Sequence, residues 1–342
     1  MSQPRVSLLV AMRNEVRYIQ RCLDSLIAQD YPFGCLEIWV MDGQSTDGSQ
    51  QIVERILRDS SNAHLISNPG ITQAKGWNIG IESATGQIIG IVSAHSELAT
   101  DYVSKAVETL QRTGADMVGG PMHGDSPTRV GQAIALATSS RFGVGGARFH
   151  YTTREEPVDT VYMGVCWKDL YQRIGGFDEA MVNNQDDELS YRILKQGGRI
   201  ICNPAIRSRY YNRATLRSLW RQYFQYGYWK VGVMHRHPHQ IRPRHFAPPT
   251  FVASLLCLAS LALFTTIGAI LLGSVGGAYV LVNLTASART AYKGGSRHMA
   301  LLPLTFPVLH LSYGLGFLTG VLDFLVRGRK SAMGATNVPV FR

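Results

Sequence analysis

Residues 247–288 contain no charged side chain, and this stretch limits the possible folds more than any other feature of the chain. A helix that crosses a membrane needs about 20 apolar residues, so the stretch is long enough for two crossings. We expect one span at 251–272, a glycine-rich turn at 273–277 and a second span at 275–292. The chain therefore consists of a membrane part and a preceding part of ordinary composition, which we consider separately.

A third apolar segment, residues 299–325, is harder to interpret. Pro303 and Pro307 should break its first half, so it could be a third span, a re-entrant element or an interfacial helix. With two spans, Arg289, Lys293 and Arg297 return to the side of the preceding domain, as the positive-inside rule expects. A full third span would place Arg327, Arg329 and Lys330 on the far side, against that rule. We favour two full spans and a partial insertion.

The 342 residues allow one large soluble domain beside the membrane part. We predict a soluble domain at 1–215, basic aromatic interfacial helices at 216–246, a transmembrane region of two to three spans at 247–326 and a basic tail at 327–342. The N-terminus shows no basic and apolar signal-peptide pattern, and the five scattered cysteines resemble reduced core thiols. We therefore expect a multi-pass protein of the bacterial inner (plasma) membrane whose soluble domain is cytoplasmic.

The net charge of +10 is unevenly distributed. No acidic residue lies between Glu188 and Asp323, whereas the first half of this gap holds many arginines and lysines. A stretch of this kind favours phosphate groups. Nucleic acid is one candidate, but no nucleic-acid motif accompanies the run. Because it leads into an apolar segment, anionic lipid headgroups or a lipid diphosphate fit better.

The first third alternates short apolar runs with segments of helical period. We expect strands at 6–11, 37–41, 64–67 and 87–93 and helices at 15–28, 49–58 and 72–84, with Asn14 as the cap of the first helix. This order predicts an α/β domain with a mostly parallel sheet. Its ligand should lie at the carboxyl ends of the strands, where Arg13, Asp42 and His95 would converge.

Two motifs near the start carry a family resemblance. Residues 6–15, V-S-L-L-V-A-M-R-N-E, and residues 37–47, E-I-W-V-M-D-G-Q-S-T-D, resemble the opening of family-2 glycosyltransferases, although Ala11 replaces the usual proline. The resemblance implies a Rossmann-like, A-type nucleotide-sugar-binding fold, with the base near Ala11, Arg13, Glu15 and Asp42. A carboxylate such as Asp42 can accept a hydrogen bond from a base imide, but an ordinary turn role for Asp42 and Asp47 stays open.

Two further segments resemble the part of this family that binds the donor diphosphate. Residues 68–80 form a small-residue turn into a helix, with Lys75 and Asn78 near a helix N-terminus that favours anions. Ser93, Ala94 and His95 stand where relatives carry D-x-D, which binds ribose and a divalent cation. The resemblance implies Mn²⁺ or Mg²⁺ with His95 as a ligand. Serine at 93 weakens such a site, although Glu97 could supply charge.

The acceptor side is indicated by Gly164, within M-G-V-C-W-K, and by N-N-Q-D-D-E-L-S-Y-R at 183–192. The second string resembles the family's E-D-x-D-L-x-x-R element, which makes Asp186 the base that takes the acceptor hydroxyl proton in an inverting transfer. Asp187 and Glu188 would line the acceptor or diphosphate site. Alternatively, the three acids form the first turn of a helix without chemistry.

Residues 216–230 combine arginines with aromatic side chains. Their Q-Y-F-Q-Y lies where processive synthases of cellulose and hyaluronan carry Q-x-x-R-W, and the loss of Arg and Trp argues against a processive polymerase. Arg213 and Arg221 could hold a diphosphate bidentately. An amphipathic interfacial helix is the simpler alternative.

Taken together, the motifs resemble the succinoglycan-biosynthesis β-glucosyltransferases. This implies an inverting transfer from a nucleotide-diphosphate sugar, UDP-sugar first, to a membrane lipid-linked polyprenyl-diphosphate saccharide in cell-surface or exopolysaccharide synthesis. Alternatives are a catalytically lapsed relative that only binds its ligand, a polyprenyl-phosphate glycosyl synthase, and a membrane-tethered nucleic-acid-binding protein. Neither the sugar nor the oligomeric state follows from the sequence.

Overall fold

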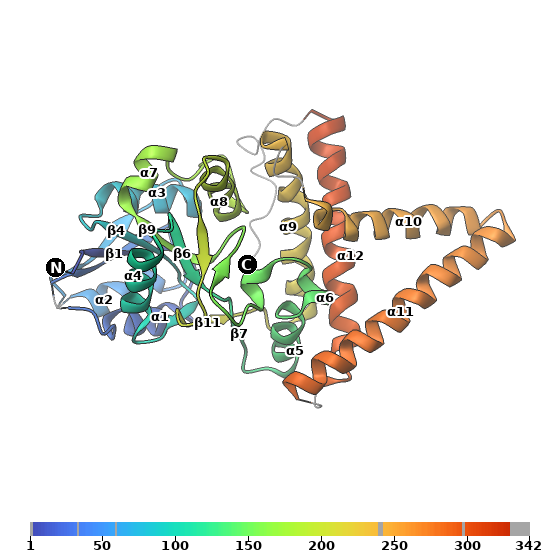
Figure 1. Cartoon of the computed structure of the whole chain (residues 1–342), viewed down its shortest axis with the longest axis horizontal. Helices are drawn as coiled ribbons and strands as arrows, with labels where there is room; N and C mark the ends of the chain where they lie inside the picture. The colour runs from blue at the N-terminus through green and yellow to red at the C-terminus, as the bar shows by residue number, and fades with distance from the viewer. Residues whose placement is uncertain (1–2, 33, 59, 239–241, 296–297, 329–342) are drawn as a thin grey trace. The chain divides into compact units, whose positions relative to one another are not determined.

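The computed structural model describes residues 3–32, 34–58, 60–238, 242–295 and 298–328 (Figure 1). Its contacts divide the chain into two units. The first comprises residues 1–123 and 148–211, and the second comprises residues 124–147 and 212–342. Arg297, Arg329, Lys330 and the predicted basic tail from residue 329 onward lie outside the described residues.

The first unit is built on an eight-stranded sheet with the strand order β3-β2-β1-β4-β9-β6-β10-β8. Strands β3, β2, β1 and β4 are mutually parallel, whereas β9 runs antiparallel to both β4 and β6. The strands are β1 Val6–Met12, β2 Leu36–Asp42, β3 Ala63–Ser67, β4 Ile88–Ser93, β6 Met117–Gly120, β8 Glu156–Pro157, β9 Tyr162–Trp167 and β10 Ile200–Cys202. A separate antiparallel pair joins β5 Ser96–Leu98 to β11 Ser208–Tyr211.

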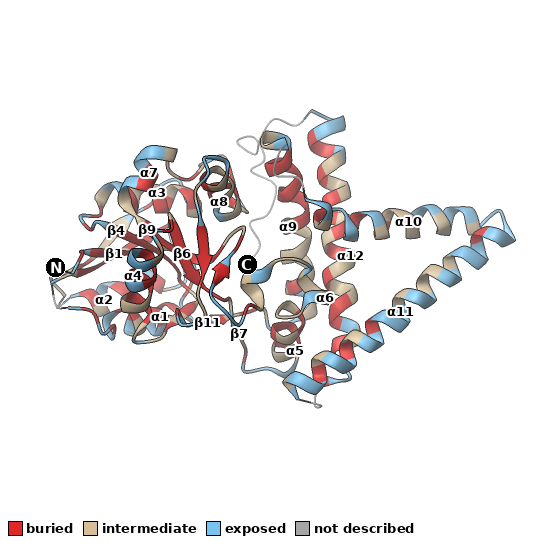
Figure 2. Ribbon diagram, viewed as in Figure 1, coloured by how far each residue is buried: buried red, intermediate tan, exposed pale blue. Residues whose placement is uncertain are grey.

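Helices cover both faces of this sheet. One core contains residues of α1 Ile19–Ile27, α2 Ser49–Leu57 and α4 Tyr102–Thr113. The other contains residues of α3 Gln73–Ser83, α7 Lys168–Ile174 and α8 Gln185–Lys195. The central strands are buried on both faces (Figure 2), as expected for a parallel sheet between two helical layers. The predicted α/β fold class is confirmed.

The start of the first helix was predicted wrongly. Helix α1 begins at Ile19, four residues later than expected, and Asn14 does not cap it. Asn14 has a left-handed φ of 56°, and its Oδ1 accepts a hydrogen bond from the backbone N–H of Thr46 at 2.8 Å. A long-range contact therefore uses the side chain that local capping rules assign to the helix.

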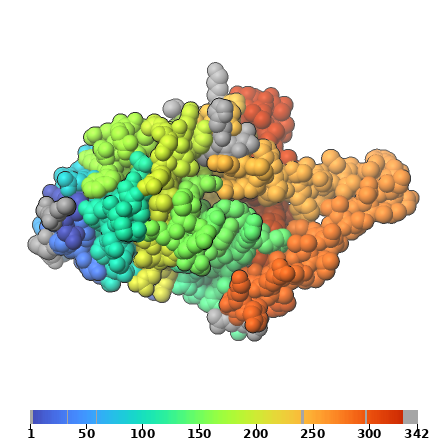
Figure 3. Space-filling view, viewed as in Figure 1, coloured from blue at the N-terminus to red at the C-terminus, as the bar shows by residue number. Residues whose placement is uncertain are grey.

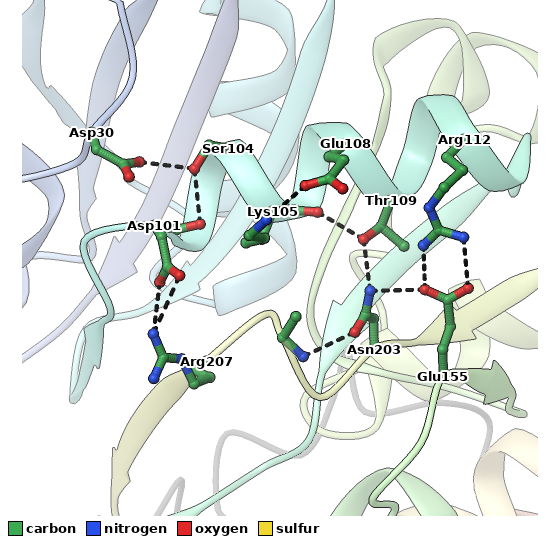
Figure 4. A network of polar contacts seen from close by, with 11 residues as sticks. Asp30, Asp101, Ser104, Lys105, Glu108, Thr109, Arg112, Glu155, Asn203 and Arg207 are labelled. Atoms are coloured by element: carbon green, nitrogen blue, oxygen red, sulfur yellow. Dashed lines mark hydrogen bonds and ion pairs between the residues drawn. The ribbon is translucent and has the colours of Figure 1, made fainter.

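Polar side chains fix the exposed face of α4 to the loops around it (Figure 4). Arg112 donates to Glu155 at 3.0 Å, and Asn203 donates to both Thr109 and Glu155. At the other end of the helix, Arg207 donates to Asp101 at 3.2 Å. These exposed ion pairs each contribute little to stability, but they fix the segment that precedes β8 and the segment that follows β10.

Glu37 in β2 stabilises the amino end of the sheet. Burial alone would raise its pKa, but hydrogen bonds from Ser7 at 2.5 Å and from Thr85 outweigh burial and lower the pKa to about 2. The stabilisation is present above the unfolded-state pKa of about 4.3 and is lost as pH falls toward 2. We expect Glu37→Gln to lower the free energy of unfolding at neutral pH by roughly 2 kcal/mol and to flatten its dependence on pH between 5 and 2. Denaturant titration would show this, and equal acid sensitivity in both proteins would contradict it.

The second unit is helical. Its elements are the short strand β7 Gly124–Asp125 and the helices α5 Arg129–Thr138, α6 Arg141–Val144, α9 Leu216–Arg236, α10 Ala247–Ala262, α11 Thr266–Gly294 and α12 Leu302–Val321, which continues into a wider turn at Leu322–Val326. Its core joins α5, α9, α11 and α12 through Ile134, Leu219, Ala291 and Phe306. Residues 124–147 belong to this unit, whereas their sequence position predicted that they lie in the soluble domain.

Three segments are long and apolar enough to cross a membrane: Pro243–Ala262, Thr266–Gly294 and Leu302–Val326. The predicted turn at residues 273–277 is wrong, because these residues lie inside α11. The chain turns between α10 and α11 at residues 263–265, where Thr265 caps α11 by accepting from the N–H of Gly268 at 3.0 Å.

The predicted break at the prolines is also wrong. Pro303 lies in the first turn of α12, where its missing N–H costs no hydrogen bond, and Pro307 is accommodated inside the helix. Residues 227–234 of helix α9 are all buried within the protein, and the interfacial position of this helix stays a prediction.

Candidate active site

The carboxyl ends of β1, β2 and β4 lie side by side. The strand register pairs Met12 with Asp42 and Ala11 with Ser93. Asp42 and Ser93 are 6% and 9% exposed, so both are nearly enclosed at this edge. The structure therefore brings together Ala11, Asp42 and Ser93, with Arg13 directly following β1 and Ala94 directly following β4.

The two loops at this edge brace each other. The backbone N–H of Asn14 donates to Ser45 at 2.9 Å, that of Glu15 to Ser49 at 2.7 Å, and that of Val16 to Asp47 at 3.1 Å. Asp47 also accepts from Ser49. Asp47 therefore has a structural role, because it holds the loop at residues 42–47 against the loop that contains Asn14 and Glu15.

Asp42 stabilises a turn and can also accept further hydrogen bonds. Its carboxylate accepts the hydroxyl of Ser45 at 2.6 Å and the Ser45 N–H at 3.2 Å. These bonds hold the carboxylate at the end of β2, and a carboxylate can accept about four hydrogen bonds. Both meanings that the sequence left open for Asp42 are therefore compatible with the structure.

Glu15, His95 and Ser93 form a hydrogen-bonded row. Glu15 Oε1 lies 3.0 Å from His95 Nδ1, and His95 Nε2 lies 3.3 Å from Ser93 Oγ. Since a carboxylate only accepts, the proton belongs on Nδ1, and in the neutral ring Nε2 accepts from the serine hydroxyl. The ring of Tyr210 lies 5.2 Å from that of His95. Both nitrogens of His95 thus have partners within the chain.

These residues do not fit a divalent cation. Glu97, which could have replaced the missing aspartate, accepts a short hydrogen bond from Tyr211 and lies 4.0 Å from Arg209. Ser93 offers a neutral hydroxyl, and His95 would have to release a partner. Within the described ranges, no three His, Cys, Asp or Glu side chains gather as a metal site would require. The predicted role of His95 as a ligand for Mn²⁺ or Mg²⁺ therefore has one carboxylate beside it, that of Glu15, where hard cations prefer several oxygen ligands.

A metal-removal experiment follows from this arrangement. We expect the affinity for a nucleoside diphosphate, measured by titration calorimetry on the detergent-purified protein, to differ by less than about threefold between EDTA and Mn²⁺, or roughly 0.7 kcal/mol. The double change Ser93→Asp, His95→Asp restores two carboxylates and should make binding tighter with Mn²⁺ than with EDTA. Loss of wild-type binding in EDTA would contradict this reasoning.

Lys75 and Asn78 contact the loop before α8. Lys75 Nζ lies 3.1 Å from Glu179, and Asn78 donates to Glu179 and to the carbonyl of Phe177, both at 2.9 Å, while accepting the Phe177 N–H. Asn78 and Lys75 together hold the pKa of Glu179 below its usual value. Both residues join α3 to residues 177–179, and their role as nucleotide-sugar ligands stays a prediction.

Helix α8 presents Asp186 at its N-terminus. Gln185 is buried and donates to Gln73 at 2.7 Å, which ties the start of α8 to the start of α3. Asp186 is exposed in the first turn, where the helix dipole favours its negative charge. Asp187, beside it, is half-buried. The predicted base therefore lies on the helix that is tied to the proposed diphosphate side.

Glu188 has a structural role. It is 2% exposed and accepts two hydrogen bonds from Arg192, each 2.8 Å long. Arg192 also donates to the carbonyls of Ile174 and Gly176, both at 2.7 Å. The E-L-S-Y-R part of the motif thus holds the turn at 174–176, and the prediction of Glu188 as an acceptor ligand is not supported by this geometry.

Three remaining predictions have different outcomes. Gly164 lies inside β9, where an added Cβ would approach the sulfur of Met117 to 2.6 Å, so its small size serves packing. Arg213 and Arg221 belong to the second unit, and their proposed diphosphate role stays a prediction.

Sequence reasoning missed three contributors, Glu179, Arg192 and Tyr211. Each acts through a partner distant in sequence; Lys75 and Glu179, for example, are 104 positions apart. The alternating string S-R-Y-Y at 208–211 was the available signal for β11 and Tyr211.

Comparisons with known proteins show what this chain is similar to. A family model described as "Glycosyl transferase family 2" matches residues 7–175. The chain is 26% identical over 326 residues to the dolichyl N-acetyl-alpha-D-glucosaminyl phosphate 3-beta-D-2,3-diacetamido-2,3-dideoxy-beta-D-glucuronosyltransferase of Methanococcus voltae, covering 93% of this chain and 97% of that protein. It is also 26% identical over 324 residues to the succinoglycan biosynthesis protein ExoA of Rhizobium meliloti (strain 1021), covering 93% and 95%.

Solved structures share the fold. The mannosyltransferase PcManGT from Pyrobaculum calidifontis, in complex with GDP-Man and Mn²⁺, is similar with a TM-score of 0.59 and 20% identity, covering 94% of this chain and 88% of that one. Residues 1–349 of S. aureus TarS, in complex with UDP-GlcNAc, are similar with a TM-score of 0.53 and 17% identity, covering 95% and 92%.

Proposed function

Because this chain is a glycosyltransferase with a family 2 domain at residues 7–175, we propose that it moves a sugar, with inversion, from a nucleotide-diphosphate sugar to a membrane lipid-linked saccharide. The proposed donor is a UDP-sugar, and the proposed acceptor is a polyprenyl-diphosphate-linked saccharide of cell-surface or exopolysaccharide synthesis. The proposed location is the bacterial plasma membrane, with the first unit in the cytoplasm.

One observation carries the proposal. Asp186 is an exposed carboxylate at the N-terminus of α8, and the bond between Gln185 and Gln73 fixes this N-terminus to that of α3. The N-terminus of α3 is the element that favours the donor diphosphate. A base on α8 would therefore act close to the leaving group.

The donor assignment is supported by Asp42 and by two relatives in fold. Asp42 can accept a hydrogen bond from the imide N–H of uracil or from N1–H of guanine. The two similar structures contain GDP-Man and UDP-GlcNAc. Asp42 can serve either base in this way, and we take a UDP-sugar as the first donor to test.

The acceptor assignment is supported by the membrane segments and the relatives. Three helical segments are apolar enough to cross a bilayer. One relative is named for a dolichyl-linked sugar phosphate and another for succinoglycan biosynthesis. A lipid-linked saccharide presents its hydroxyl at the headgroup level, which such an enzyme can reach without releasing the lipid.

In the proposed step, Asp186 takes the proton of the acceptor hydroxyl as that oxygen forms a bond to the anomeric carbon. The bond between the anomeric carbon and the diphosphate oxygen breaks on the opposite face, so that the nucleoside diphosphate leaves and an α-linked donor gives a β-linked product. The departing charge would lie at the N-terminus of α3, where the helix favours an anion.

The test is release of nucleoside diphosphate by the detergent-purified protein over a panel of nucleotide sugars, with and without a bacterial lipid extract. Lipid-dependent release that Asp42→Ala weakens would support the proposal. A product extracted as a lipid monophosphate sugar would favour the polyprenyl-phosphate synthase alternative. Binding of a nucleotide sugar without release in any arm would favour a catalytically lapsed protein.

A further inference from the structure

Helices α9 and α12 lie side by side in the second unit and run in the same direction (Figure 1). Phe224 meets Gly316, Tyr228 meets Gly320, and Gly232 meets Phe324, so both chains advance together. The backbones are close enough that a Cβ added to Gly316 would lie 2.0 Å from the carbonyl oxygen of Phe224. The two helices therefore form one rigid pair, and neither can be placed in a membrane without the other.

Helix α9 is too charged to cross a bilayer. It carries cations over its whole length and no acidic residue; these cations are Arg217, Arg221, Lys230 and Arg236. Each Arg or Lys near the bilayer centre costs about 2.5–3.5 kcal/mol on insertion scales. An α12 that crossed the membrane would therefore carry the cations of α9 with it.

The face of α12 opposite α9 is a stripe of apolar side chains. The stripe advances by four and three residues alternately, which keeps it on one side of a helix; its members are Leu304, Val308, Leu311, Leu315, Leu318, Leu322 and Leu325. Leu304, Leu322 and Leu325, at the two ends of the stripe, are 57%, 42% and 56% exposed. The four members between them are half-buried, and Val308 packs against the core of the unit. The glycines that meet α9 lie about half a turn away from this stripe.

The α10–α11 hairpin leaves α12 on the side away from α9 (Figure 3). Its first turns contact the middle of α12 through Pro248 and Val252 at Gly314, and its return is anchored by a bond from Asn283 to the carbonyl of Pro303 at 2.9 Å. At its tip, Leu263 and Phe264 are 80% and 84% exposed. The stripe therefore adjoins the base of a hairpin whose tip is apolar and exposed.

We propose that α12 is not a third membrane span but lies along the membrane surface, with its leucine stripe in the boundary between headgroups and acyl chains. In this arrangement the α10–α11 hairpin enters the bilayer, and α9 covers the water side of α12. Lipid is the occupant that these observations favour, because the stripe adjoins the hairpin and the opposite face carries the cations. The arrangement leaves Arg289, Lys293 and Arg327 on one side, in agreement with the positive-inside rule.

Depth measurement tests this directly on the full chain in liposomes. Nitroxide labels are placed on single cysteines at Leu304, Leu315 and Leu325, in a background with Cys35→Ser and Cys257→Ser because the other three cysteines are buried. A surface helix gives the same shallow depth at all three sites. A spanning helix would separate the outer two by about 31 Å along its axis and place Leu315 deepest. Labels at Leu271, Val280 and Tyr292 of α11 are the control and should differ in depth.

Sidedness gives a second measurement. A membrane-impermeant maleimide should reach Gly328→Cys from the same face of oriented vesicles as Lys293→Cys. Labelling of the two cysteines from opposite faces, or a depth profile with Leu315 at the centre of the bilayer, would overturn the proposal. Stripe positions that show no lipid contact but cross-link between two copies would overturn it in favour of self-association.

Discussion

Asp186→Asn should remove lipid-dependent release of nucleoside diphosphate, with a fall in kcat of roughly 10²- to 10⁴-fold, the usual contribution of a general base. The amide keeps the size of the side chain and its place in the first turn of α8, so the helix and the bond from Gln185 to Gln73 should persist. What is lost is the ability to take the acceptor proton. The measurement is the initial rate of release at saturating donor and lipid.

Two controls separate chemistry from folding for this variant. Glu82→Gln removes an exposed carboxylate from α3 and should leave the rate unchanged. Nucleotide-sugar binding to Asp186→Asn, followed by calorimetry, should stay within a few-fold of the wild type, because Asp42 and the β1 loop are untouched. A variant that keeps full transfer activity would show that another group is the base.

The sheet and its edge could be predicted because their signals are local. The run V-S-L-L-V-A-M reads as a buried strand by itself, and β1 occupies Val6–Met12. Asp42 and Ser93 each end an apolar run, so the rule for parallel strands places them at one edge without knowledge of their contacts. Recognition of the family rests on the same local strings.

The roles of Lys75, Asn78 and Glu188 could not be predicted in this way. Each lies in a motif that suggests a ligand, yet each bonds to a residue or turn that the fold brings from elsewhere: Glu179 and Phe177 for the first two, and the 174–176 turn, through Arg192, for the third. A side chain near a site satisfies the nearest partner, and a sequence pattern does not reveal which partner the fold provides. The row of Glu15, His95 and Ser93 is hidden for the same reason, since Glu15 and His95 are 80 positions apart.

The membrane part shows a different limit. Glycine destabilises a helix in water, and for this reason the sequence favoured a turn at 273–277. In an apolar environment the free energy lost by an unpaired backbone group exceeds the entropy that glycine would gain in a turn. Helix α11 therefore continues through these residues. The actual turn uses Thr265, a weak signal in an apolar stretch. Residues 124–147 join the helical unit through contacts such as the bond from His310 to the carbonyl of Phe142 at 2.8 Å, which spans 168 positions.

Gly316→Leu should strongly destabilise the second unit, because the side chain would have to enter the contact between α12 and α9. Its Cβ would lie 2.0 Å from the carbonyl oxygen of Phe224, and backbone on both sides leaves no flexible group to move away. Overpacking of this kind costs about 3 kcal/mol or more, which corresponds to a fall in Tm of roughly 6–12 °C for a unit of this size. The measurement is thermal unfolding of the purified protein in detergent, together with the yield of monodisperse protein.

Gly273→Leu is the matched control for this prediction. It makes the same substitution inside an apolar helix, but nothing lies within 4 Å of an added Cβ at Gly273. Replacing a helical glycine with leucine should there be neutral or stabilising by up to about 1 kcal/mol. The difference in stability between the two variants therefore measures the cost of forcing α9 and α12 apart. The general effect of leucine in an apolar helix is common to both variants. If Gly316→Leu were as stable as Gly273→Leu, the two helices would not pack at this distance, and the argument that α9 keeps α12 at the membrane surface would lose its basis.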